Sequence, residues 1–146
     1  MTFAGVNYLA ILVAGVAGWL AGAVWYGVLA KPWVAAHGAT MEEFKAKQEA
    51  KKGTPAAYAP FILALIADLV MAWVLAGLIG HLGPGQVTLR NGIISGAFAW
   101  LGFVVTTMAV NNAFGDKKPM LTVIDSGHWL LVLVVQGAII GAMGVR

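Results

Sequence analysis

The sequence has no cysteine and few charged residues. Its 146 residues include 9 Lys and Arg and 6 Asp and Glu, so charged residues make up 10% of the chain, against roughly 25% in soluble domains. The absence of cysteine excludes a disulfide scaffold, a zinc module built on paired cysteines and a thiol redox centre. The low charge, together with 60% hydrophobic residues, excludes both an ordinary soluble enzyme and a disordered chain.

The sequence contains four long apolar stretches that are almost free of charge. They run over residues 7–29, 59–80, 91–114 and 120–145, with Asp68 and Asp125 as the only formal charges inside them. Each stretch is longer than the roughly 20 helical residues that cross a bilayer. The sequence therefore predicts one all-α domain over 1–146, an integral membrane four-helix bundle. The first stretch is interpreted as a span rather than a cleaved signal peptide, because no basic residue precedes it.

The segment between the first two stretches, residues 30–58, contains a helix signal of its own. Thr40 and Glu43 form a capping box, and Gly53 with Pro55 marks the stop. We therefore expect a short basic helix along the membrane surface. It would be either a solvated connector or a helix that contacts lipid headgroups.

Basic residues are distributed unequally between the two sides of the predicted bundle. One side has Arg90 and Arg146, and the other has seven lysines: Lys31, Lys45, Lys47, Lys51, Lys52, Lys117 and Lys118. Short loops rich in lysine and arginine stay in the cytoplasm. We therefore expect segment 30–58 and the turn 116–119 to be cytoplasmic and both termini to face outward.

Small residues recur at four-residue spacing in each stretch. The glycines among them are Gly18, Gly22, Gly92, Gly96, Gly137 and Gly141. Such stripes let helix backbones approach closely within lipid. They either pack the four helices against one another or form contacts between copies. Because four stripes exceed what one small bundle needs, the sequence favours a homo-oligomer or docking on a larger membrane assembly.

Polar residues inside the stretches define a candidate site. They are Asp68, Thr106, Thr107, Asn111, Asp125 and His128. Asp125 and His128 are three residues apart and Thr107 and Asn111 are four apart, so each pair shares one helix face. We expect these groups in one polar pocket in the inner half of the membrane, since ionisable groups inside a membrane are functional hypotheses by default. The alternative is that Asp125 and His128 form a buried pair that fixes helix packing.

The sequence also contains aromatic residues near the predicted membrane boundary, and it has no pattern typical of a cofactor site. Trp25, Tyr26 and Trp33 lie where an interfacial aromatic belt is expected. His128 is the only histidine inside a stretch, so the sequence predicts neither a haem held by two facing histidines nor any other cofactor or metal. Ser126 lies beside Asp125 and His128, but neighbours on one helix point in different directions, so we expect no catalytic triad. No nucleic-acid motif is present.

Several short runs resemble a known family. They are Gly22-Ala23-Val24-Trp25-Tyr26, Lys31-Pro32-Trp33, Thr40-Met41-Glu42-Glu43 and Leu101 to Thr107, followed by Asn111, Phe114, Lys118-Pro119, Ile124 and His128. In order and spacing they resemble the bacterial membrane family known as domain of unknown function 1761. The family pattern usually has an aromatic residue before the histidine, where this chain has Gly127. The resemblance implies a small four-span inner-membrane protein of unassigned activity.

Two classes of function remain. The chain is expected to be a non-catalytic membrane component that oligomerises or docks through its glycine stripes. The alternative is a small-solute or proton-linked transporter or channel that uses the Asp and His groups, since histidine changes charge near neutral pH. The first is favoured because the ionisable groups are few and no discontinuous helix is evident.

Overall fold

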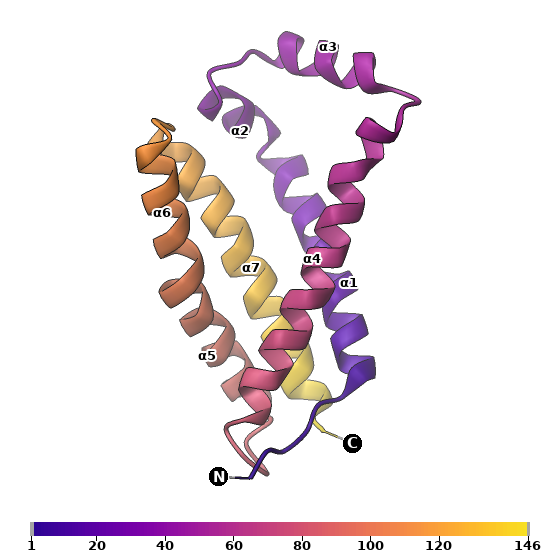
Figure 1. The fold of residues 1–146 in the computed structure, drawn as a ribbon, viewed down its shortest axis with the longest axis vertical. Coiled ribbons are helices and arrows are strands. Elements are labelled where there is room, and N and C mark those ends of the chain that lie inside the picture. Colours follow the sequence, from indigo (N-terminus) through magenta and orange to yellow (C-terminus); the bar gives the residue numbers. More distant parts are fainter. Residues whose placement is uncertain (1, 146) are drawn as a thin grey trace.

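The computed structural model describes residues 2–145 and consists of helices joined by short connections (Figure 1). In chain order these are α1 (Tyr8–Val28), α2 (Ala30–Ala36), α3 (Met41–Lys51), α4 (Pro55–Gly80), α5 (Leu89–Ala99), the π-helical turn η1 (Trp100–Val104), α6 (Val105–Phe114) and α7 (Pro119–Met143). No strand occurs within residues 2–145. The all-helical architecture predicted from the sequence is confirmed.

Four helices are long and apolar enough to cross a membrane: α1, α4, the continuous helix Leu89–Phe114 made of α5, η1 and α6, and α7. The prediction is least accurate at α4, which begins at Pro55 rather than at residue 59. Both α4 and α7 begin with proline, which fits the first turn because the amide there has no partner within the helix.

Both termini lie at one end of the bundle, here called the terminal end (Figure 1). Asn7 fixes this arrangement. Its side-chain oxygen accepts from the Ala10 amide at 3.2 Å and caps α1, and its amide donates to the Gly144 carbonyl just after α7 at 3.2 Å. One side chain thus joins the start of the first long helix to the end of the last.

The opposite end, here called the α3 end, is covered by the two short helices. Thr40 accepts from the Glu43 amide and begins α3, as the capping box predicts. α2 is not predicted from the sequence. It continues from α1 after Leu29 and packs Ala36 against Leu121 and Ile124 of α7.

α7 is the central helix and contacts α1, α4, α5 and α6. A buried apolar core joins Ile11 of α1 and Ile79 of α4 to Leu133 and Ile140 of α7. Toward the α3 end, the hairpin of α6 and α7 diverges from α4 (Figure 1). The larger apolar core therefore lies toward the terminal end, and a smaller one of Ala36, Leu121 and Ile124 lies at the α3 end.

The third span is interrupted by the turn η1. A π turn contains one more residue than an α turn, so it shifts by one position which later residues face the bundle. The Val104 amide region departs from regular α geometry, with φ −97° and ψ −66°. No discontinuity was expected here, and it changes which residues of α6 face α7.

The predicted glycine stripes lie inside the bundle. A Cβ atom added to Gly92, Gly96 or Gly141 would collide with the backbone carbonyl of Gly137, Leu133 or Thr88 respectively. Gly18 and Gly22 face α7 from the other side. The expectation that the stripes exceed the needs of one bundle is therefore wrong, because a single chain uses all six glycines.

Candidate functional site

Asp125 is the centre of a polar cluster near the α3 end. Its Oδ1 atom accepts two hydrogen bonds, from Tyr26 Oη of α1 at 2.6 Å and from Trp33 Nε1 of α2 at 3.0 Å. The rings of Tyr26 and Trp33 meet edge to face with centroids 5.7 Å apart. Asp125 of α7 thus holds two other helices through one oxygen atom.

His128 lies one turn further along α7 and is buried. Its ring is 4.9 Å from the ring of Tyr26 and 4.4 Å from that of Trp129. The Nε2 atom faces Gly22, where an added Cβ would lie only 2.6 Å away. The Nδ1 atom is buried and has no hydrogen-bond partner among the described residues. Gly22 therefore provides the space for the imidazole ring.

Two tryptophan indoles hold the same part of α7 from outside. Trp25 Nε1 donates to the Ile124 carbonyl at 3.0 Å, and Trp100 Nε1, in η1, donates to the Ser126 carbonyl at 2.7 Å. A Cβ at Gly127 would lie 2.8 Å from the Trp25 ring, so this glycine lets the indole approach. The backbone around Asp125 is thereby fixed between α1 and the third span.

Trp25, Tyr26 and Trp33, predicted as interfacial aromatic residues, also bond to the interior of the bundle. All three side chains are only partly exposed, and each donates its polar hydrogen to α7. The physical reason is that a buried indole or phenol needs an acceptor, and Asp125 with the Ile124 carbonyl supplies acceptors inside the bundle.

A second polar group lies deeper. Gln136 of α7 is fully buried, and its Nε2 atom donates to the backbone carbonyl of Asp68 in α4 at 3.0 Å. The Asp68 side chain is 2% exposed. Neither Asp68 Oδ1 nor Gln136 Oε1 has a partner among residues 2–145. Gly18 faces this pair, because an added Cβ would lie 2.8 Å from Gln136 Nε2.

The predicted single pocket is in fact two clusters. His128 and Gln136 are eight residues apart on α7, which corresponds to about 12 Å along the helix axis. Val132, fully buried, lies between them. Asp68 therefore belongs with Gln136 rather than with Asp125 and His128. Gln136 was not predicted as a site residue. Its amide two turns beyond His128, in an otherwise apolar stretch, does indicate a buried polar group.

Thr106, Thr107 and Asn111 belong to neither cluster, which corrects the prediction. All three are exposed on the bundle surface. Thr106 Oγ1 donates to the Gly102 carbonyl at 2.9 Å, and Thr107 Oγ1 donates to the Phe103 carbonyl, so both hydroxyls bond within their own helix. Asn112, one position on, is the residue that reaches α7.

The π turn explains this one-residue shift. Asn112 Nδ2 donates to Thr122 Oγ1 of α7 at 3.0 Å. A regular helix from Gly96, which faces α7, would place residue 111 close to the same face. The extra residue in η1 moves that position to 112. The glycines of α5 and Asn112 of α6 can thus both face one partner helix.

The family model described as "Protein of unknown function (DUF1761)" matches residues 9–141. The chain belongs to this family. No curated protein and no solved structure matches it. Membership in DUF1761 covers both polar clusters, because Asp68, Asp125, His128 and Gln136 all lie within the matched residues.

The chemistry open to the two clusters is proton and hydrogen-bond exchange. Within residues 2–145, no three His, Cys, Asp or Glu side chains lie together in a way that could hold a metal ion. What the clusters offer is one imidazole nitrogen and two oxygens, each able to accept a hydrogen bond. All of them are buried between helices that are apolar enough to span a membrane.

Proposed function

We propose that this protein binds protons between its helices and acts as a small proton-linked channel. One observation carries the proposal. Three buried side-chain atoms, His128 Nδ1, Asp68 Oδ1 and Gln136 Oε1, have no hydrogen-bond partner among the described residues. A buried polar atom without a partner costs about 1–3 kcal/mol. Of these three side chains, Asp68 and His128 can take up a proton, whereas the Gln136 amide oxygen can only accept a hydrogen bond from a protonated group.

The arrangement of the clusters supports loading from one side. Asp125 is half-buried near the α3 end, His128 is buried one turn further, and the Asp68 and Gln136 pair lies deeper still. Beyond Gln136, the buried side chains Ile11, Ile79 and Ile140 are apolar. Protons would therefore enter from the α3 end, and release on the other side would require these apolar contacts to open.

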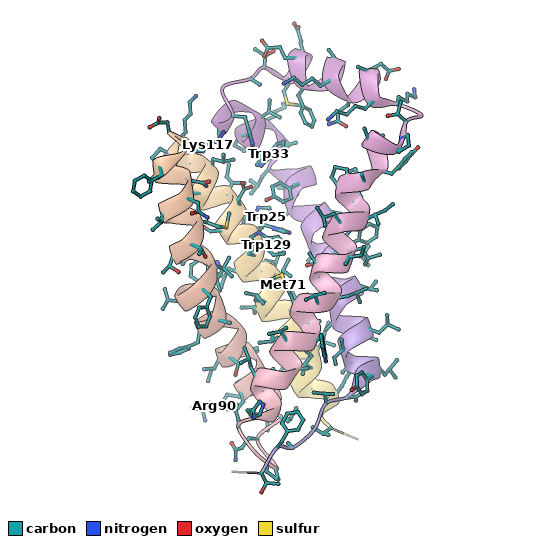
Figure 2. All side chains as sticks on the ribbon, in the orientation of Figure 1. Trp25, Trp33, Met71, Arg90, Lys117 and Trp129 are labelled. Carbon is teal, nitrogen blue, oxygen red and sulfur yellow. The ribbon has the colours of Figure 1, made fainter. Side chains whose placement is uncertain are left out.

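We further propose that the α3 end faces the cytoplasm of a bacterial inner membrane. Lys117 lies at this end and Arg90 at the terminal end (Figure 2). The seven lysines of segment 30–58 and of the turn before α7 all belong to the α3 end. The positive-inside rule then places both termini outside.

Proton movement in liposomes tests the proposal. The purified protein is reconstituted with a pH-sensitive dye inside the vesicles, and a pH step is applied outside. The parent is expected to speed internal acidification, whereas Asp68→Asn and His128→Ala reduce the rate toward that of empty vesicles. Thr107→Val is the matched control, because its hydroxyl bonds only within its own helix. Parent vesicles no faster than empty ones, or variants as fast as the parent, would refute the proposal.

The accessory role remains a second candidate because of the third span. Only 6% of its most apolar window is buried, against 44% for α7. Its outer side exposes Phe98, Phe103 and Phe114. A partner helix could pack there, and we propose this surface, rather than the glycine stripes, as the contact of a homo-oligomer or a larger assembly. Crosslinking through single cysteines at these positions in native membranes, against Val28→Cys on α1, tests this candidate.

A further inference from the structure

A pocket of about 250 Å³ lies at the α3 end between the two short helices. α2 contributes Trp33 and His37 to its lining, and α3 contributes Phe44, Lys47 and Lys51. It adjoins the Asp125 cluster, with which it shares Trp33, but none of its lining residues carries a proton in the proposed path.

The floor of the pocket is aromatic and fixed. The Trp33 ring lies 4.2 Å from the His37 ring and meets the Phe44 ring edge to face at 5.9 Å. The Trp33 indole is held because its Nε1 donates to Asp125, and Val34 beside it is 2% exposed. Such a floor suits the glycerol and first acyl carbons of a lipid better than a fully hydrated ion.

The rim of the pocket is cationic. Lys47 and Lys51 are one helical turn apart on α3, so their side chains share one face. The single ion pair among residues 2–145 joins Lys52 to Glu49, which leaves both rim lysines without a carboxylate partner in the described chain. Glu43 is the one acidic residue in the lining, so the two lysines leave a net positive charge.

The position of the pocket further limits which ligands can bind there. α3 bridges α2 and the start of α4 beyond the ends of the spans (Figure 1), which is the level where headgroups of a surrounding membrane are expected. A ligand here needs an anionic group at the rim and an apolar group on the floor. We propose that this pocket binds the phosphate-bearing headgroup of an acidic phospholipid, with Lys47 and Lys51 on the phosphate and with Trp33 and Phe44 beneath the glycerol.

Charge-matched variants of the full chain test the proposal. K47Q/K51Q removes the two rim lysines. K45Q/K52Q removes the same charge from α3 and its C-cap residue, at positions outside the lining. All four lysines are exposed, so neither double variant disturbs buried packing. Phosphatidylglycerol is titrated into the protein in neutral detergent, and bound lipid is counted by native mass spectrometry.

Each basic residue near an acidic lipid contributes about 1 kcal/mol, which corresponds to roughly fivefold in affinity. K47Q/K51Q is therefore expected to weaken binding of the first phosphatidylglycerol at least tenfold, and K45Q/K52Q no more than about twofold. Phosphatidylcholine should bind the parent as weakly as phosphatidylglycerol binds K47Q/K51Q. F44A, with its charge intact, should also weaken phosphatidylglycerol binding.

Three results would overturn the proposal. Equal weakening in both double variants would reduce the effect to general attraction by a basic helix. Unchanged lipid binding in K47Q/K51Q would show that the two rim lysines do not contribute to binding. Competition by inorganic phosphate at millimolar concentration, with no loss in F44A, would make the ligand a soluble anion. None of these measurements depends on proton transport, so the two proposals fail separately.

Discussion

α7 has two helix–helix interfaces that contain glycine, here called the α5 seam and the α1 seam, and the glycines have a different role in each. Against α5, Gly92 and Gly137 face each other so closely that a Cβ on either would collide with the carbonyl of the other. Against α1, Gly18 and Gly22 face the side chains of Gln136 and His128. The first seam is backbone against backbone, and the second makes room for polar side chains. The difference separates the part that holds the bundle together from the part that holds the candidate site.

The α5 seam is expected to be the most sensitive to substitution. Gly92→Ala places a methyl group on the Gly137 carbonyl, and neither backbone can move without displacing a helix. We expect a loss of about 3 kcal/mol of stability, the upper range for overpacking, or failure to fold. Thermal unfolding in detergent measures this change.

Gly77→Ala on α4 is the control for that substitution, because no atom lies within 4 Å of its added Cβ. It should leave stability unchanged or slightly raised, since alanine favours helix. Equal effects of the two substitutions would mean that α5 and α7 do not touch as described.

A substitution in the α1 seam should reduce proton movement more strongly than it reduces stability. Gly22→Ala pushes against His128 Nε2, the end of a side chain that can rotate away. We expect a cost of about 1–2 kcal/mol, below that of Gly92→Ala, together with loss of proton movement in liposomes. A stable Gly22→Ala protein with the parent rate would show that the imidazole position is unimportant.

Removing one donor to Asp125 should have a smaller effect. Tyr26→Phe deletes the 2.6 Å hydrogen bond and keeps the ring, so a loss of about 1 kcal/mol is expected. Trp33 donates to the same oxygen at 3.0 Å. A double-mutant cycle of Tyr26→Phe with Trp33→Phe should therefore be non-additive. Strict additivity would argue against a shared acceptor.

The smallest effect is expected outside both seams. Thr107→Val removes a hydroxyl that bonds only to carbonyls of its own helix and lies on the exposed surface. Stability should change by less than about 0.5 kcal/mol. A loss of stability as large as that of Tyr26→Phe would mean that Thr107 contributes to the candidate site after all.

The sequence predicts the spans and part of the site because hydropathy and helical spacing are local properties. The four stretches, the Thr40 cap of α3 and the shared face of Asp125 and His128 all follow from such patterns. The pairing of Asp68 with Gln136 does not, because it joins residues 68 positions apart on different helices.

Two kinds of error have physical causes that one sequence does not display. In an almost wholly apolar helix such as α1, hydropathy does not say which face turns inward, so the hydrogen bond from Tyr26 to Asp125 does not follow from the sequence. The π turn at Trp100–Val104 has no sequence signature that the analysis could use, and it moves the inward position from Asn111 to Asn112.

The central claim is that protons reach the buried polar face of α7. The most direct test is ¹⁵N NMR of the three histidine side chains in the reconstituted protein, titrated between about pH 5 and pH 8. His37 and His81 are exposed and serve as internal controls. The account predicts that the His128 ring signals also change with external pH, and that Asp125→Asn alters the change. His128 ring signals that stay unchanged over this pH range would contradict it.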